Sequence, residues 1–353
     1  MANTPEAPDL DLKKGVKNLV DNWGALQALP PNYILPLPRC SLPVLEAPIP
    51  VIDMSCLYEH PDCRLHTVRD IGLACSQWGF FRVINHGVNV SLMQEMLKSV
   101  EAFFSLPWDE KMKYASDNVM DPVRYGTSMN SSAPHALHWR DYFRHFGHPV
   151  HNTVHLWPHM PPGYKKVAKE YLEAVWHLAL RLAGAISQSL GLEESYIEAS
   201  LGEGCQIIAS NYYPPCPQPH QTLGLSAHSD HGGLTVLMQN DVDGLQVRHE
   251  DTWVPIRHME DTFIINVGDY LEILSNGRYK SVEHRAVVNE KRTRISIAVG
   301  HGPELSTIVA PATMLISGGE KAKYRPVVYA DYMRMQQSSV IRGKTPLESL
   351  RID

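Results

Sequence analysis

The chain has 353 residues, 44% of them hydrophobic and 20% charged, which is the balance of a globular protein with a sizeable core in one large domain or two. Its formal net charge is −6 at pH 7 and it has no basic run, which argues against a nucleic-acid or anionic-membrane partner and favours a small molecule. No stretch reaches the roughly 18 apolar residues that span a bilayer, and the N-terminus lacks the features of a secretory signal, so we expect a cytoplasmic protein.

The first third of the chain alternates predicted strands and helices. Residues 28–50 contain seven prolines and are expected to form an extended lead-in, because proline fits neither a helix interior nor a central strand. Short strands are predicted at "IPVID" and "GFFRVI", with a helix at "HTVRDIGLACSQW" between them. A second helix is predicted to open at Ser91, since Ser91 and Gln94 have the spacing of a capping box.

The middle of the chain divides into an irregular part and a regular one. Residues 110–160 have little periodicity and many aromatic, histidine and proline residues, which predicts a long functional loop. Residues 163–190 repeat apolar side chains at helical spacing and predict one long amphipathic helix.

After Gly204 the pattern changes to short runs of period two. Strands are predicted at "CQIIASNYY", "GLTVLMQ", "GLQVRH", "TWVPIR", "TFIINVG", "HRAVV" and "RISIAV", separated by turn signals. Many short strands at near-regular spacing indicate a sandwich or barrel, and with the helices outside it the predicted class is α+β.

One short stretch, "LGLSAHSDHGGLTVLMQ", brings His228, Asp230 and His231 within four residues. Because residues two apart in a strand face the same side, His228 and Asp230 are expected to point together and His231 away from them. His-x-Asp also occurs at His60 and at His249, where a surface turn is expected.

A metal site needs a third ligand from another strand, and His284 in "YKSVEHRAVV" is the best candidate. The six cysteines include no C-x-x-C pair, so any metal would be held by imidazole and carboxylate groups. Two histidines and one carboxylate with open positions suit a non-heme Fe(II) oxygenase. A zinc hydrolase uses the same set and is the rival hypothesis, beside a catalytically silent ligand-binding protein.

A candidate anion site lies further along the chain. Arg294 and Ser296 in "RTRISIAV" share one strand face, and a buried arginine needs an anionic partner. A dicarboxylate such as a keto acid fits, and Tyr213 can add a hydrogen bond from across the barrel.

The motifs "NYYPPCPQP", "LGLSAHSDHGGLTVL", "NVGDYLEILSNGRYKSVEHRAVV" and "RISIAV" occur in the order and at the spacing of a known family. With "IPVIDMS", "WGFFRVINHGV", "FFSLPWDEKMKY" and "WRDYF" further upstream, the chain resembles the plant-type 2-oxoglutarate- and Fe(II)-dependent dioxygenases from about residue 48 to its end. These include flavone synthase and anthocyanidin synthase, within the isopenicillin N synthase-like superfamily.

The resemblance implies a double-stranded β-helix, or jelly roll, with flanking helices. It implies that His228, Asp230 and His284 are the iron ligands and that Arg294, Ser296 and Tyr213 bind 2-oxoglutarate, with Asn211 near it. By sequence the chain divides into an N-terminal helix and proline-rich lead-in at 1–47, an N-terminal α/β region at 48–160, and a region with the long helix, the jelly roll and a C-terminal helix at 161–353.

The resemblance also implies an enzyme that uses Fe(II), 2-oxoglutarate, O₂ and ascorbate as reductant, and that is a monomer. Its substrate would be a small aromatic specialised metabolite, hydroxylated or desaturated with release of succinate and CO₂. Oxidation or O-demethylation of a hormone-like small molecule is the alternative. The residues expected to contact the substrate are Tyr125, Asn130, Tyr142, Phe143, Phe146 and Gly300, and Gly300 and Gly302 predict a roomy pocket.

Overall fold

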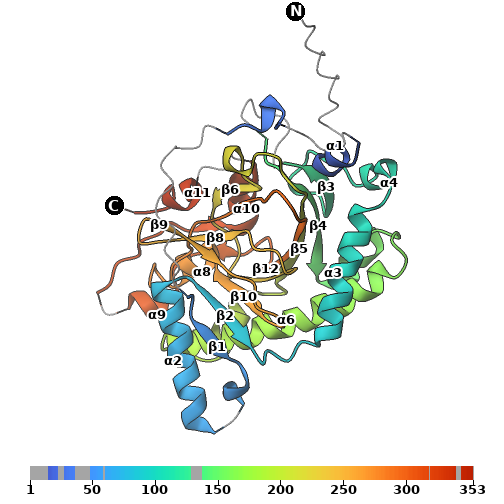
Figure 1. The fold of residues 1–353 in the computed structure, drawn as a ribbon. Helices are drawn as coiled ribbons and strands as arrows, with labels where there is room; N and C mark the ends of the chain where they lie inside the picture. Colours follow the sequence, from blue (N-terminus) through green and yellow to red (C-terminus); the bar gives the residue numbers. More distant parts are fainter. Residues whose placement is uncertain are drawn as a thin grey trace, which may run out of the picture.

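The computed structural model describes residues 15–22, 28–35, 48–58, 60–128, 137–317, 319–338 and 343–352. Two main β-sheets face each other at the centre and helices cover their outside (Figure 1). This arrangement confirms the predicted α+β jelly roll with flanking helices.

The larger sheet has eight strands in the order β1-β2-β10-β7-β12-β5-β4-β3, and the smaller has four in the order β6-β11-β8-β9. β1 pairs in parallel with β2, and the other pairs in these sheets are antiparallel. The strands are β1 (Val51–Asp53), β2 (Phe80–Ile84), β3 (Val123–Thr127), β4 (Asp141–His148), β5 (Cys205–Tyr213), β6 (Leu225–His228), β7 (Leu234–Gln239), β8 (Leu245–His249), β9 (Thr252–Ile256), β10 (Phe263–Val267), β11 (His284–Ala286) and β12 (Arg294–Gly302), with β13 (Ile308–Val309) and β14 (Val327–Val328) paired separately.

The helices lie outside the sheets (Figure 1). They are α1 (Val16–Asn22), α2 (Pro61–Gln77), α3 (Val90–Phe104), α4 (Trp108–Met112), α5 (Val150–Thr153), α6 (Tyr164–Ser189), α7 (Tyr196–Ser200), α8 (Asp269–Leu274), α9 (Thr313–Ile316), α10 (Tyr329–Ser338) and α11 (Thr345–Glu348), with short 3-10 turns at Pro31–Tyr33, Ser55–Leu57, Val154–Leu156 and Pro219–Gln221. α6 confirms the predicted long helix.

The main core lies between α6 and the outer face of the larger sheet. In β12 the alternate residues Ile295, Ile297 and Val299 are buried in this core, together with Leu182 and Ile186 of α6. Each fully buried aliphatic side chain stabilises the fold by roughly 1.5–3 kcal/mol relative to exposure. The residues between them in β12 therefore face the space between the two sheets.

Two local predictions are wrong. Residues 110–160 are not one long loop, because β3 and β4 lie within them and pair with each other and with β5. Both faces of β4 carry polar and aromatic groups, so its alternation has no apolar signature. The second helix begins at Val90 rather than Ser91: Asn89 caps it by accepting a hydrogen bond from the Ser91 amide over 2.8 Å.

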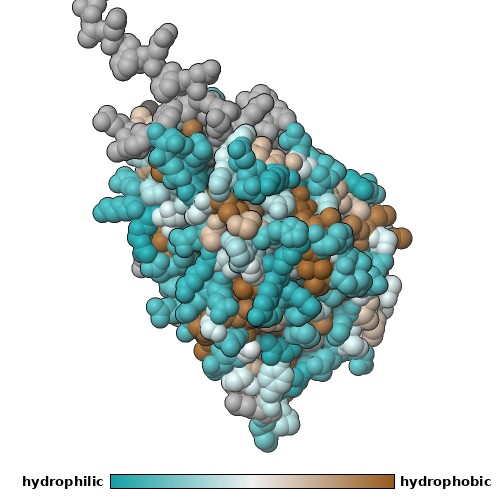
Figure 2. Space-filling model, turned by 90° about the vertical axis from the view of Figure 1, so that its right-hand side faces the viewer, coloured by the Kyte–Doolittle hydropathy of each residue, from teal (hydrophilic) through white to brown (hydrophobic). Residues whose placement is uncertain are grey.

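The division of the sequence at residue 160 stays a prediction, although the larger sheet takes strands from both sides of it. The face in Figure 2 is largely hydrophilic with interspersed apolar patches, as is usual for a protein surface. Within the described ranges no helix has both the length and the apolar character to cross a membrane.

Candidate active site

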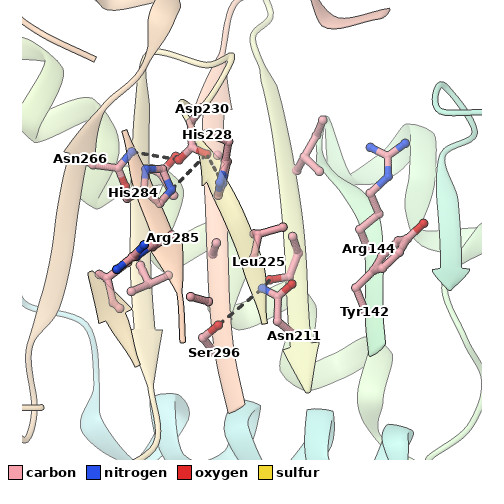
Figure 3. A pocket seen from close by; sticks show the side chains of 18 of the residues that line it. Tyr142, Arg144, Asn211, Leu225, His228, Asp230, Asn266, His284, Arg285 and Ser296 are labelled. Carbon is pink, nitrogen blue, oxygen red and sulfur yellow. Dashed lines mark hydrogen bonds and ion pairs between the residues drawn. The ribbon is translucent and has the colours of Figure 1, made fainter. Parts of the chain in front are cut away.

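Three potential metal ligands converge between the two sheets. His228 ends β6 and His284 begins β11, and the two residues are direct partners in this antiparallel pair. Their Nε2 atoms each lie 3.7 Å from Oδ1 of Asp230, and their ring centres are 4.3 Å apart (Figure 3). All three donor atoms lie within 4.8 Å of one another, a spacing that allows them to bind one metal ion.

The prediction that His228 and Asp230 point together from one strand is only partly right. β6 ends at His228, so Asp230 lies in the turn that follows and not on the strand. Its backbone carbonyl accepts a 2.7 Å hydrogen bond from the Asp269 amide, which fixes the turn. His231 does lie outside the ligand cluster, but it also borders the cavity, and its Nδ1 shares a 2.8 Å hydrogen bond with the Tyr329 hydroxyl.

Neighbouring groups orient each donor atom. Nδ1 of His228 lies 2.9 Å from the Ser226 carbonyl, so this nitrogen carries the proton and Nε2 is free to bind a metal. Oδ2 of Asp230 accepts hydrogen bonds from Thr235 Oγ1 at 2.6 Å and from Asn266 Nδ2 at 2.9 Å. Only Oδ1 of this carboxylate remains for the metal.

The protonation states suit metal binding. Burial, followed by the nearby His284, lowers the pKa of His228 to about 3, so its imidazole is neutral. Burial opposes the charge of Asp230, yet the two histidines and the hydrogen bonds from Thr235 and Asn266 hold its pKa well below the usual range. A neutral imidazole and an ionised carboxylate are the ligand forms that bind divalent metals.

A second polar group lies beside the triad on β12 and β5. Strand register pairs Arg294 with Tyr213 and Ser296 with Asn211. The Arg294 guanidinium is buried, lies 5.1 Å from the Tyr213 ring centre, and donates to Ser296 Oγ at 3.5 Å. Asn211 Nδ2 also lies 3.5 Å from Ser296 Oγ (Figure 3).

Arg294 has spare binding capacity. One terminal nitrogen donates to Gln239 Oε1 at 2.7 Å, but Nε has no hydrogen-bond partner, and no carboxylate of the described ranges forms an ion pair with this arginine. Burial lowers its pKa, which Tyr213 opposes. Gly244 makes room for the side chain, because a Cβ there would lie 2.6 Å from Arg294 Cδ. The geometry can bind the carboxylate of a small anion.

A cavity of about 190 Å³ joins the triad to this arginine group. Of the predicted substrate contacts, Tyr142 and Gly300 border the cavity. A Cβ at Gly300 would meet only Ile207 O at 3.9 Å and Thr235 Oγ1 at 4.0 Å, so this position is open. Gly302 has no such room, because a Cβ added there would lie 2.2 Å from the Tyr329 hydroxyl. Gly302 is also not among the residues that border the cavity.

The other predicted contacts are not part of the cavity wall. Tyr125 and Phe143 are buried in the core around Phe103, whose ring stacks on Phe143 at 4.0 Å. Phe146 packs in a small apolar cluster with Met333. Asn130 lies outside the described residues. Phe143 alternates with the cavity-facing Tyr142 on β4, and Tyr125 is its direct partner on β3, so both lie on the side of the helices. Phe146 shares the face of Tyr142 but lies nearer the end of β4, beside Met333.

Sequence reasoning missed Thr235, Asn266 and Gln239. Each is a polar residue in an otherwise apolar strand run, "LTVLMQ" or "FIINV", and that contrast was the available signal. It also missed Arg124, Arg140 and Arg285, which border the cavity together with Arg144.

The chain is similar to known proteins over most of its length. Residues 204–303 match the model of the 2OG-Fe(II) oxygenase superfamily, and residues 49–161 match that of the N-terminal part of non-haem dioxygenases in morphine synthesis. The chain is 40% identical to oxoglutarate-dependent flavonoid 7-O-demethylase 1 of Ocimum basilicum, over 93% of this chain and 89% of that protein. It is 41% identical to flavanone 3-dioxygenase 2 of Oryza sativa subsp. japonica, over 92% and 94%. The crystal structure of JOX2 in complex with 2OG, Fe and JA matches with a TM-score of 0.85 at 34% identity, covering 96% of this chain and 98% of that one.

Proposed function

The chain belongs to the 2OG-Fe(II) oxygenase superfamily, and on that premise we propose that it oxidises a small aromatic specialised metabolite at a site built on His228, Asp230 and His284. It is an oxygenase that depends on Fe(II) and 2-oxoglutarate. The observation that carries the residue assignment is the convergence of two imidazole nitrogens and one carboxylate oxygen within 4.8 Å. A hydrolytic zinc site would not call for the adjoining buried arginine.

The three side chains fit iron(II) in their donor chemistry. Imidazole and carboxylate are ligands of intermediate and hard character, and the remaining side of the cluster opens on the cavity. When bound, Fe(II) together with 2-oxoglutarate and O₂ supplies the oxidising power that hydroxylates or desaturates a substrate C–H bond, with release of succinate and CO₂. The protein keeps Nε2 of both histidines and Oδ1 of Asp230 aimed at one point.

Arg294, Ser296 and Tyr213 would bind the far carboxylate of 2-oxoglutarate, with Asn211 beside them. The unpartnered Nε of Arg294 and the absence of an acidic partner in the described ranges support this role, because a buried guanidinium without an anion is costly. A fixed clamp would present the keto acid to the metal in one orientation and so lower the entropy cost of reaction.

The substrate class follows from the relatives and the cavity. The basil and rice relatives are named for flavonoids, which supports an aromatic substrate for this chain. The cavity is bordered by apolar residues such as Phe80, Leu225 and Leu237 together with Tyr142, and such a lining holds a ring and excludes water. Oxidation of a hormone-like molecule is the second candidate, because JOX2 was crystallised with JA.

Ascorbate as reductant, O₂ as cosubstrate, a monomeric chain and a cytoplasmic location complete the proposal. They rest on the resemblance of the chain to its family and on its composition.

The test is a panel of phenolics, alkaloids and hormones incubated with the protein, Fe(II), 2-oxoglutarate and ascorbate. We expect at least one compound to stimulate succinate formation and to change mass by a gain of one oxygen, a loss of two hydrogens or a loss of CH₂. Substrate-dependent succinate formation by an iron-loaded His228→Ala variant would contradict the ligand assignment.

A further inference from the structure

The cavity wall opposite the triad carries three buried arginines. Arg124 on β3, Arg144 on β4 and Arg140 just before β4 are each 4–6% exposed. Arg144 lies across the cavity from His228 and Asp230 in Figure 3. Asp230 is the only carboxylate among the described residues that border this cavity. The wall therefore has a large excess of positive charge.

Two of these arginines oppose each other directly. Arg124 and Arg144 are partners in the antiparallel β3–β4 pair. Like charges at directly opposite positions destabilise a sheet, and burial without a counter-ion adds to the cost. Neither side chain forms an ion pair with any carboxylate of the described ranges.

In the described part of the chain their hydrogen-bond partners are backbone carbonyls, and the Arg124 guanidinium also lies 5.9 Å from the Tyr142 ring centre. Nε of Arg124 donates to Ser116 O at 3.1 Å, and its two terminal nitrogens make no hydrogen bond within the described part of the chain. A terminal nitrogen of Arg144 donates to Val119 O and Asp121 O, while its Nε has no partner. Burial and the neighbouring Arg124 lower the pKa of Arg144 to about 10, so it stays charged at neutral pH. The pair can therefore accept an anion.

Arg140 has a different role, because its terminal nitrogens are occupied. They donate to Asn211 Oδ1 at 3.0 Å and to Ser128 O at 3.2 Å. Its guanidinium also lies 5.0 Å from the Tyr142 ring centre. We assign it to the support of Asn211 and Tyr142 rather than to ligand binding.

The space between the metal side and the arginine pair is kept open by small side chains. One row of direct strand partners crosses β12, β5, β4 and β3. It consists of Ala298, Ala209, Arg144 and Arg124, in that order. Two alanines thus form the floor that leads from the metal side to the arginines. Gly126 makes room for the Tyr142 ring, because a Cβ there would lie 2.9 Å from the Tyr142 hydroxyl.

We propose that the substrate carries a carboxylate and that Arg124 and Arg144 bind it, so that the ring lies over the alanine floor and the carbon to be oxidised faces the triad. This inference rests on the proposed oxygenase function and narrows its substrate class to aromatic acids. Two adjacent guanidinium groups match the two oxygens of a carboxylate.

The test compares acids with their neutral methyl esters. Benzoate, 4-methoxycinnamate and 1-naphthylacetate, each beside its methyl ester, are titrated by calorimetry into the full chain loaded with Mn(II) and saturating 2-oxoglutarate. Mn(II) prevents turnover, and saturating 2-oxoglutarate keeps Arg294 occupied. We expect at least one acid to bind about tenfold more tightly than its ester, a difference typical of a charge-assisted pair.

Two variants and one control locate the effect. Arg124→Gln and Arg144→Gln should each weaken binding of the acid about tenfold and leave the ester unchanged. Arg285→Gln is the control, because it removes a positive charge that borders the same cavity but lies on β11. Arg285 already donates to Gln246 and lies 4.2 Å from the Trp253 ring centre. This variant should keep the preference for the acid. Thermal unfolding checks that each variant is folded.

The wild-type comparison alone can overturn the inference, whether or not the variants fold. Equal binding of acid and ester in all three pairs contradicts it. A preference that survives in both glutamine variants also contradicts it and places the anion elsewhere. These binding results do not depend on turnover, so they are separate from the succinate test of the oxygenase function.

Discussion

On one side of the cavity, groups on β6, β7 and β10 hold His228, Asp230 and Arg294 by hydrogen bonds. On the other side, Arg124 of β3 and Arg144 of β4 donate to backbone carbonyls of residues 116–121, and these arginines have donors to spare. These hydrogen bonds hold the side chains of the first wall in place before any ligand binds, as catalysis by orientation requires. In the second wall the two arginines have no carboxylate partner within the described ranges, and a bound anion would supply one. Chemistry and substrate choice are thus separated in space.

The largest effect is expected from His228→Ala, which removes one imidazole donor from the set of three. We expect no detectable succinate and loss of tight Fe(II) binding, because two donors do not make a stable site. Metal content after dialysis and succinate formation are the measurements. His60→Ala is the matched control, since His60 and Asp62 have the same spacing but are highly exposed, and it should behave as the wild type.

Arg294→Gln should raise the KM for 2-oxoglutarate on the order of 100-fold, because it leaves a buried carboxylate without its cation. Succinate formation against 2-oxoglutarate concentration measures it. Arg292→Gln tests an arginine two residues earlier that is exposed and paired with Asp241 at 2.6 Å. Equal KM values for the two variants would refute the clamp.

Thr235→Val removes the 2.6 Å hydrogen bond to Oδ2 of Asp230 and keeps the shape of the side chain. Loss of a group that orients a ligand should weaken metal affinity about 10- to 100-fold. Calorimetric titration with Mn(II) measures it, and Thr235→Ser should restore most of the affinity. If valine binds the metal as tightly as threonine does, the orienting role is wrong.

Gly300→Leu tests whether the open position on β12 helps to select the substrate. Its Cβ has room, so the fold should hold while the cavity narrows, and the KM for the substrate found in the panel should rise by about tenfold. The KM for 2-oxoglutarate should stay the same. Gly302→Leu is the contrasting variant: it would collide with the Tyr329 hydroxyl and should lower the melting temperature. An unchanged substrate KM in Gly300→Leu would remove this position from the pocket.

Much of the fold was predictable because its signals are local. The helix α6 repeats apolar residues over seven turns, and the strands after Gly204 alternate or run apolar between turn residues. β4 was missed for a physical reason: Tyr142 and Arg144 face the cavity, while Phe143 and His145 pack towards α3 and α6. With polar and aromatic groups on both faces, no apolar period marks it.

The convergence of two imidazoles and one carboxylate was predictable as a set of residue types and only partly as a geometry. His228, Asp230 and His284 were identified through motifs, yet Asp230 reaches the cluster from a turn. Tyr125 and Phe143 were expected beside the substrate and are in the core. The face of the sheet on which a side chain lies depends on the pairing register of its strand. A shift of one residue in this register moves every side chain to the opposite face.

Composition, periodicity and spacing along the chain were enough to predict the α+β class, the imidazole and carboxylate donors, and the arginine and serine pair. It took the folded structure to show that Arg124 of β3 lies directly opposite Arg144 of β4 and that both border the cavity of the triad. Sheet register sets these neighbours through backbone hydrogen bonds between distant segments. No local pattern encodes which residues of two strands will meet.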